Sequence, residues 1–148
     1  KKGTKNVVYL WAKKEFQNIS KCYDCGIPVV KPRHVSKNIL IMDFEGKDGK
    51  PENTLLESEI DENDYHQSIE LISDLFKKAK LVHGDFSEYN IFKTKNGLKL
   101  FDLGSAVDTT HPNTMNFLKR DINNITNFFV KRGLTVENPA DILERITK

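Results

Sequence analysis

Three polar residues in one short stretch have the types and the spacing that phosphoryl transfer requires. Asp85 and Asn90 are five residues apart, and Asp102 follows Asn90 by twelve residues. ATP-dependent phosphoryl transfer uses an aspartate that can accept a hydroxyl proton, an asparagine, and a second aspartate that can hold Mg²⁺. Oxygen ligands suit Mg²⁺, which keeps part of its water shell and also binds the nucleotide phosphates. The spacing therefore predicts a phosphotransferase site.

A predicted β-hairpin brings Asn90 and Asp102 together. Two short apolar runs, at 90–92 and 98–101, flank the turn-like Lys95-Asn96-Gly97, and an Asn-Gly between apolar runs is typical of a hairpin. In this hairpin Asn90 lies at the start of the first strand, and Asp102 follows the end of the second strand. We therefore expect both side chains to converge on one site.

The same residues have a simpler interpretation, because Asp and Asn often stabilise turns. A lone Asp or Asn would favour that interpretation. Three of them, preceded by His83-Gly84 and followed by Gly104, constrain residue type, spacing and local fold together. For this reason we favour the phosphotransferase site.

The elements around this site are predicted from hydrophobic periodicity and from turn residues. Apolar positions follow a helical period in three segments, and Asn138 before Pro139 is a helix start. The predicted elements are a helix over Val8–Cys22, a strand over Ile39–Phe44, a helix over Tyr65–Ala79, the hairpin, a helix over Asn113–Arg132 and a short helix from Pro139.

Length and composition indicate one soluble, globular domain. The chain has 148 residues, of which 38% are apolar and 30% are charged. No apolar run approaches the roughly 18 residues of a membrane span, and Lys1–Lys5 lacks the apolar stretch of a signal peptide. We expect a protein of the reducing cytosol, in which Cys22 and Cys25 are free thiols rather than a zinc site or a redox motif.

Charge is distributed unevenly along the chain. Residues 1–14 contain five lysines and no acidic residue, whereas residues 52–74 contain eight acidic residues and no Lys or Arg. The basic segment could contact nucleic acid and the acidic segment a basic partner. Each segment taken alone is more simply a solvated surface.

Residues 83–90, His-Gly-Asp-Phe-Ser-Glu-Tyr-Asn, resemble the catalytic loop of the RIO atypical protein kinases. Further stretches also resemble the family. Trp11–Phe16 resembles its helix C and Gly26–Pro28 the turn after that helix. Ile39–Phe44 resembles its hinge strand, Gly46–Gly49 the loop after the hinge, and Phe117–Asp121 the helix after its metal-binding loop. The Trp-Ala-x-Lys-Glu and Gly-Lys-Asp-Gly motifs are nearer to the first main branch of the family than to the second.

This resemblance implies an α+β, protein-kinase-like (RIO) fold in one domain. Residues 1–44 are expected to be the helix C and hinge-strand remainder of the N-terminal lobe, and residues 45–148 a mostly helical C-terminal lobe. The chain contains no G-x-G, so we expect the glycine-rich loop and the strand lysine that hold ATP in kinases on missing strands upstream of Lys1. The segment after Gly104 is also too short for a kinase activation segment.

The resemblance implies a role for each site residue. Asp85 is the expected general base, and Asn90 and Asp102 are the expected Mg²⁺ ligands. The aspartate that matches Asp102 can itself become a phosphoaspartate in the family. The residues expected to bind the nucleotide, with Glu15 paired to the upstream lysine, are Glu15, Met42, Asp43, Phe44, Glu45, Ser87, Tyr89 and Asn90.

Two further residues are expected to support the catalytic loop, Asp121 as a hydrogen-bonding anchor and His83 as an orienting group. The sequence also departs from the family near the site. Asp43 stands where the family usually has Glu, Glu45 where it usually has an apolar residue, and 103–105 replaces a commoner tail with Gln.

The implied function is a cytoplasmic RIO-type serine/threonine kinase and ATPase in maturation of the small ribosomal subunit, with ATP and Mg²⁺ or Mn²⁺ as cofactors. Its expected partners are the pre-ribosomal small subunit, both rRNA and ribosomal proteins, and the missing N-terminal strands, with no membrane. One alternative is a small-molecule phosphotransferase of the aminoglycoside or choline kinase type, against which Ser87-Glu88-Tyr89 and the Trp11 helix argue. The other is a non-catalytic assembly factor gated by nucleotide.

Overall fold

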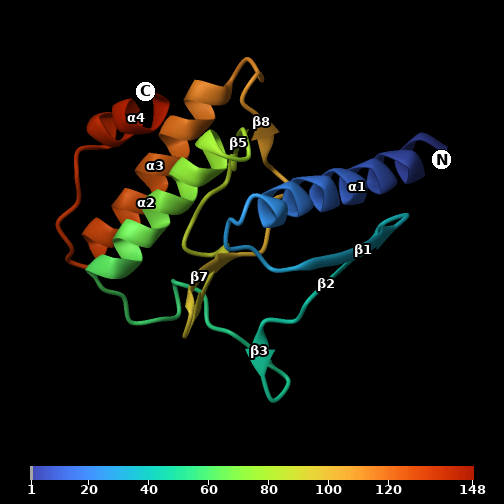
Figure 1. The fold of residues 1–148 in the computed structure, drawn as a ribbon, viewed down its shortest axis with the longest axis horizontal. Coiled ribbons are helices and arrows are strands. Elements are labelled where there is room, and N and C mark those ends of the chain that lie inside the picture. Colours follow the sequence, from blue (N-terminus) through green and yellow to red (C-terminus); the bar gives the residue numbers. More distant parts are fainter. Residues whose placement is uncertain (1) are drawn as a thin grey trace.

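The computed structural model describes the backbone of residues 2–148 and the side chains of residues 10–148. A long helix and several short strands lead into a second helix, and a hairpin then precedes two final helices (Figure 1). The elements are α1 Lys2–Asp24, β1 Pro32–Ser36, β2 Ile39–Met42, β3 Gly46–Lys47, β4 Lys50–Pro51, α2 Glu62–Lys77, β5 Leu81–Val82, β6 Ile91–Thr94, β7 Gly97–Leu100, β8 Val107–Asp108, α3 Thr114–Lys131 and α4 Pro139–Thr147.

The main core lies where α2, α3 and α4 pack on one another and where α2 packs on the β6–β7 hairpin. Aromatic and aliphatic side chains from all of these elements are fully buried there, and they include Tyr65, Leu75, Ile91, Leu100, Leu118, Ile125, Phe129 and Ile142. α2 begins in a capping box between Asp61 and Asp64, and this arrangement satisfies the free N–H groups of its first turn. No helix within residues 2–148 is long and apolar enough to cross a bilayer.

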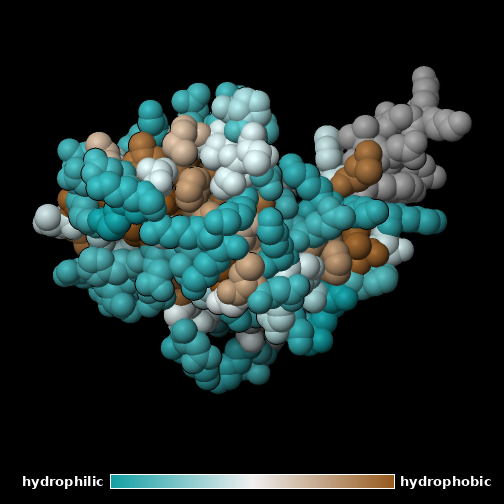
Figure 2. All heavy atoms as spheres, turned by 45° about the horizontal axis from the view of Figure 1, so that its top comes forward, coloured by the Kyte–Doolittle hydropathy of each residue, from teal (hydrophilic) through white to brown (hydrophobic). Residues whose placement is uncertain are grey.

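α1 packs against the antiparallel β1–β2 hairpin, apart from the helical body (Figure 1). The outer face of this part is apolar: Trp11 exposes 66% of its surface and Ile39 58%. Figure 2 shows such apolar atoms at the surface on the right-hand side of the molecule. Among the side chains of α1 that the structure describes, those of residues 10–24, the first buried one is that of Ile19.

The predicted helices and hairpin are all present, with shifted ends. α1 begins at Lys2 rather than at Val8, and β2 ends at Met42 rather than at Phe44. Four short strands pair in two antiparallel sheets, β3 with β4 and β5 with β8. Each of these strands has only two residues, which is too few to show an alternating pattern in the sequence.

Candidate active site

The β6–β7 hairpin presents Asn90 and Asp102 at the same end. Ile91 pairs with Leu100 in the antiparallel register, so Asn90 comes directly before this pair and Asp102 two residues after it. At the opposite end the chain turns through Gly97, whose φ of +116° is disfavoured for other residues. The predicted hairpin is confirmed, and with it the placement of both residues at its open end.

The loop between β5 and β6 closes on itself through Asn90. The side-chain amide nitrogen of Asn90 donates to the carbonyl of Asp85 at 2.7 Å, and its backbone N–H donates to the carbonyl of Ser87 at 3.0 Å. The hydroxyl of Ser87 accepts from the backbone N–H of Tyr89 at 3.3 Å, so Ser87 stabilises the turn. This leaves the Oδ1 atom of Asn90 without a hydrogen-bond partner among the described residues, and Asp85 is exposed.

His83 connects this loop to the segment that carries Asp102. Its Nδ1 accepts from the backbone N–H of Asp85 at 3.1 Å, and its Nε2 is hydrogen-bonded to the carbonyl of Asp102. Burial lowers the pKa of His83, and a neutral imidazole with one donor and one acceptor matches both contacts. His83 therefore orients Asp85 and Asp102 relative to each other without facing solvent itself.

Two neighbouring residues of α3 bind the backbone of the catalytic loop. The carboxylate of Asp121 accepts from the N–H groups of Gly84 at 2.9 Å and of Phe86 at 3.1 Å, and the Arg120 guanidinium donates to the carbonyl of Gly84. Burial raises the pKa of Asp121, although these N–H groups oppose the shift. The anchor role expected of Asp121 is seen in these contacts. The contact of Arg120 has no signal in the sequence.

The carboxylates of Glu15, on α1, and Asp102 both lie close to Gly104. A Cβ atom placed on Gly104 would lie 3.5 Å from Oδ1 of Asp102 and 3.5 Å from Oε1 of Glu15. Burial, and secondly the charge of Asp102, raise the pKa of Glu15. Among the side chains of residues 10–148, no Lys, Arg or His forms an ion pair with either carboxylate. This position therefore carries negative charge that a cation would compensate.

The side chains predicted to bind the metal suit Mg²⁺. Asn90 offers an amide oxygen and Asp102 a carboxylate, and hard oxygen donors favour Mg²⁺ over metals that prefer nitrogen or sulfur. Within the described part of the chain, no cluster of three or more His, Cys, Asp or Glu side chains could hold a metal alone. A Mg²⁺ ion held by one or two protein ligands together with nucleotide phosphates needs no such cluster.

The predicted hinge, residues 42–45, is an irregular segment between β2 and β3. The N–H of Asp43 donates to the carbonyl of Lys31 at 2.9 Å, and the carbonyl of Glu45 accepts from the N–H of Glu52 at 2.9 Å. The carbonyl of Asp43 and the N–H of Glu45 have no backbone partner among residues 2–148. They form the acceptor and donor pair that the edge of an adenine ring requires.

Both residues at which the hinge departs from the family form ion pairs. Arg33 binds the carboxylate of Asp43 at 2.5 and 3.1 Å, and this hydrogen bonding lowers the pKa of Asp43. Lys99 of β7 lies 3.1 Å from the carboxylate of Glu45. The ion pair between Lys99 and Glu45 connects the hinge to the catalytic hairpin, and it balances the negative charge of Glu45 within the fold.

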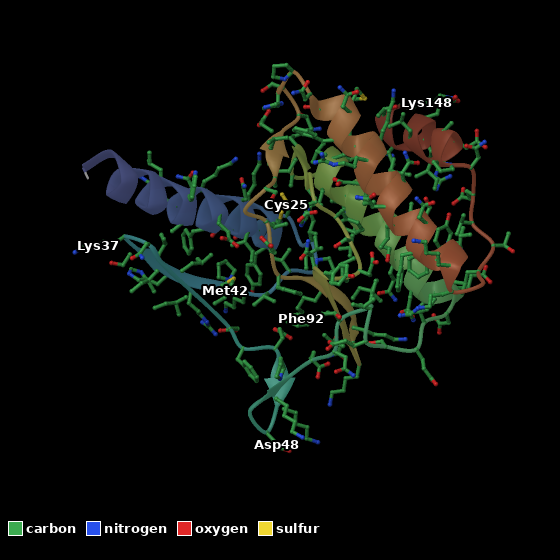
Figure 3. The ribbon with its side chains drawn as sticks, turned by 180° about the vertical axis from the view of Figure 1, so that it is seen from behind. Cys25, Lys37, Met42, Asp48, Phe92 and Lys148 are labelled. Carbon is green, nitrogen blue, oxygen red and sulfur yellow. The ribbon has the colours of Figure 1, made fainter. Side chains whose placement is uncertain are left out.

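An aromatic pair that the sequence did not single out covers the hairpin. Phe92 of β6 stacks on Phe101, with ring centroids 4.0 Å apart, and both are half-buried against the core. Met42, at the end of β2, also packs on the core, whereas Phe44 is 62% exposed. Figure 3 labels Met42 at the start of the predicted hinge and Phe92 on the β6–β7 hairpin.

Comparisons with known proteins agree with this arrangement. The family model of the RIO domain matches residues 1–142. The probable serine/threonine-protein kinase RIO1 homolog of Encephalitozoon cuniculi is 34% identical over 147 residues, which are 98% of this chain and 38% of that protein. The RIO-type serine/threonine-protein kinase Rio1 of Thermoplasma acidophilum is 37% identical over 143 residues, which are 97% of this chain and 75% of that protein.

A solved structure has the same architecture. The crystal structure of the Rio2 kinase-ADP/Mg²⁺-phosphoaspartate complex from Chaetomium thermophilum matches with a TM-score of 0.76 at 25% identity, over 95% of this chain and 45% of that chain. The fold is therefore the predicted α+β protein-kinase-like fold. The chain belongs to the RIO family, and the RIO1 names of both relatives above agree with the branch predicted from its motifs.

Proposed function

We propose that the protein transfers a phosphoryl group from ATP, as a RIO-type serine/threonine kinase with ATPase activity. The observation that carries the proposal is the chain of contacts that joins the three predicted residues. Asn90 binds the carbonyl of Asp85, and His83 binds both the N–H of Asp85 and the carbonyl of Asp102. Such fixed positioning is the main contribution a protein makes to phosphoryl transfer.

Each residue has a separate role in this proposal. Asp85, which is exposed, accepts the proton of the attacking hydroxyl. Asn90 and Asp102 hold Mg²⁺, or Mn²⁺ in its place, and the bound ion neutralises phosphate charge. The Rio2 kinase of Chaetomium thermophilum forms a complex with ADP and Mg²⁺ that contains a phosphoaspartate. This supports Asp102 as a residue that can itself receive the phosphoryl group.

The base and sugar of ATP lie, in this proposal, between the hinge and the catalytic loop. The carbonyl of Asp43 and the N–H of Glu45 bind the adenine edge, with Met42 and Phe44 beside it. Ser87 and Tyr89 line the other side. Tyr89 supports this, because 61% of its surface is exposed next to Asn90 and an aromatic ring in that position can contact a ligand.

The remaining part of the ATP site comes from β-strands that cover the apolar face of α1 and β2. Leu10, Trp11, Ile39 and Ile41 are all exposed on these elements, and a contiguous exposed apolar surface is typical of an interface. The chain spans 38% of the Encephalitozoon cuniculi relative, so relatives contain more than this segment. A lysine on such a strand would pair with Glu15, whose described surroundings hold no cation.

In the cell, we propose, the parent protein acts in the cytoplasm in maturation of the small ribosomal subunit, where it contacts rRNA and ribosomal proteins. The short segment between Gly104 and α3 supports one large docked partner over many loose peptides, because it offers no platform for an extended peptide. Binding energy away from the site can then position the chemistry. Contacts with a polyanionic precursor should weaken steeply with salt.

The test uses the full-length protein with Asp102→Ala, sedimented with cell extract beside Asp24→Ala, an exposed aspartate of α1, as the control. Because turnover times release, Asp102→Ala should accumulate on late small-subunit precursors, whereas the control should distribute like the wild type. Recovery of Asp102→Ala only in the ribosome-free fraction would contradict the proposal and favour a small-molecule phosphotransferase.

A further inference from the structure

A cleft lies at the turn end of the catalytic hairpin, whereas Asn90 and Asp102 lie at its open end. Its volume is about 690 Å³. Its walls are the β3–β4 hairpin, the segment 52–59 and the turn that joins β6 to β7. In Figure 1 the β3–β4 hairpin projects below the β7 strand. None of the residues assigned above to nucleotide, metal or proton transfer lines this cleft.

Four lysines line the cleft, and three of them are free to bind a ligand. Lys93 is already used, because its ammonium lies 2.8 Å from the carboxylate of Asp64 and donates to a backbone carbonyl. Lys47, Lys50 and Lys95 are exposed. Among the side chains that the structure describes, no carboxylate forms an ion pair with any of these three.

Three glutamates share the cleft with these lysines. The carboxylate of Glu57 already accepts from the backbone N–H and the hydroxyl of Thr54, at 3.0 and 3.2 Å, whereas Glu52 and Glu59 are available as acceptors. A polypeptide suits this mixture, because its N–H groups can donate to the carboxylates while its acidic side chains bind the ammonium groups. The phosphates of a nucleic acid can only accept hydrogen bonds, so they match the lysines and offer no donor to the carboxylates of the cleft.

The segment 52–59, which forms one wall of the cleft, is held in place by hydrogen bonds from two sides. The N–H of Lys93 donates to the carbonyl of Asn53 at 2.8 Å, which ties the segment to β6. Arg132, the residue that caps the end of α3, donates to the carbonyls of Leu56 at 2.6 Å and Ser58 at 3.0 Å. A site that is formed before its ligand arrives loses less entropy on binding.

We propose that this cleft binds an acidic segment of the protein substrate and thereby docks that substrate at a distance from Asp85. The proposal rests on the kinase function proposed above and adds the chemistry by which the substrate is recognised. Strand β6 connects the two sites, and Lys95 follows Asn90 by five positions, a span of about 17 Å at the rise of a β-strand. An extended peptide covers that span in about five residues, which sets the spacing between its acidic run and its acceptor hydroxyl.

The test measures binding of fluorescein-labelled peptides to the 148-residue chain by fluorescence anisotropy, without nucleotide. One peptide carries a run of Asp and Glu, a second carries Lys in their place, and a single-stranded RNA of equal length is the third ligand. The variant Lys47→Glu/Lys50→Glu reverses two charges of the cleft. Its matched control is Lys13→Glu/Lys119→Glu, which reverses two exposed lysines on α1 and α3.

The acidic peptide should bind best, and the cleft variant should weaken it by roughly tenfold, because two attractions become repulsions. The control should change binding by no more than about twofold, through net charge alone. Equal losses in the two variants would overturn the proposal, as would tighter binding of the basic peptide or of the RNA. Since no nucleotide is present, this result is independent of whether the full-length protein transfers phosphate.

The distance between the two sites is tested separately. A nitroxide label is placed on the acidic peptide about five residues from its acidic run, the number that covers the distance from Lys95 to Asn90. NMR signals of the backbone amides of 85–90 should then broaden, whereas a label within the run should broaden those of 47–50. Broadening of neither segment, or of 85–90 with both labels, would contradict a docked peptide that reaches the active site.

Discussion

Asp121 on α3 and Gly84 in the catalytic loop, 37 residues apart in sequence, are joined by a hydrogen bond of 2.9 Å from the Gly84 N–H to the carboxylate. The other oxygen of Asp121 accepts from Phe86, and the adjacent Arg120 binds the Gly84 carbonyl. The backbone on both sides of Asp85 is thus held by a helix that contributes no ligand to the ATP site. The position of the proposed base depends on core packing as much as on its own loop.

Removing this anchor should destabilise the protein in a graded way. Asp121→Ala leaves two buried N–H groups without an acceptor and should cost on the order of 2–4 kcal/mol of unfolding free energy. Asp121→Asn keeps one acceptor oxygen and should cost less. Urea denaturation measures both, with the exposed Asp24→Ala as the control. If Asp121→Ala cost no more than Asp24→Ala, the anchor would have no energetic role.

A pair of glycine substitutions separates backbone strain from a close contact. Gly84 and Gly26 have φ angles of +84° and +79°, so Ala should cost about 1 kcal/mol at either position. A Cβ on Gly84 would also lie 3.0 Å from the carbonyl oxygen of Ser105, whereas nothing lies within 4 Å of one on Gly26. Thermal unfolding should therefore show a larger loss for Gly84→Ala. Equal losses of stability at the two positions would mean that the loop around Gly84 and the segment around Ser105 can move apart at no cost in free energy.

Nucleotide binding by the 148-residue chain should be weak. The chain contains no G-x-G loop, and Glu15 has no described cationic partner, so the phosphates lack most of the contacts that kinases provide. Calorimetry with Mg·ATP should give a Kd weaker than roughly the micromolar range. A longer protein that includes the proposed covering strands should bind more tightly. Tight binding by the 148-residue chain would show that those strands are not needed.

Acid should weaken the attachment of α4. Arg145 binds the carboxylate of Glu137 at 2.6 and 3.2 Å, and this hydrogen bonding lowers the pKa of Glu137. Because the pKa is lower in the folded state, the stabilisation is complete above the unfolded pKa and is lost as the pH falls through the folded value. The pair is partly exposed, so its contribution is about 1 kcal/mol at most.

Glu137→Gln measures that contribution by urea denaturation at two pH values. The variant should be less stable than the wild type at neutral pH, and the difference should shrink as the pH falls through the lowered folded-state pKa of Glu137 and its carboxyl becomes protonated. Glu70→Gln, on the exposed face of α2, should show no such pH dependence. A difference that persisted in acid would indicate that packing, and not charge, accounts for the effect of Glu137.

The parts of the fold that could be predicted are those set by local sequence. The Asn-Gly turn specified the β6–β7 hairpin, and the predicted helices over 113–132 and from Pro139 agree closely with α3 and α4. The short strand pairs β3–β4 and β5–β8 could not be predicted, because two residues show no period. The exposure of Trp11 could not be predicted, because helical periodicity identifies an apolar stripe but does not say which part of it is covered.

The features of the candidate site that could be predicted are also those set by local sequence. The hairpin register follows from the turn, so the shared position of Asn90 and Asp102 followed from spacing alone. The contacts that the sequence missed join residues far apart, such as Lys99 with Glu45 and Arg120 with Gly84. Charged residues are common on surfaces, and nothing in one sequence says which pairs will meet. Tertiary packing decides those contacts.

The division of roles between Asp85 and Asp102 is the central claim. Its most direct test measures Mg·ATP binding and phosphoryl transfer on the same variants of the full-length protein. Asp85→Ala should abolish transfer and leave binding intact, because a base acts mainly in the transition state. Asp102→Ala should weaken Mg²⁺-dependent binding as well as transfer. Equal loss of binding in both variants, or transfer that survives in Asp85→Ala, would contradict the assignment of base and metal ligand.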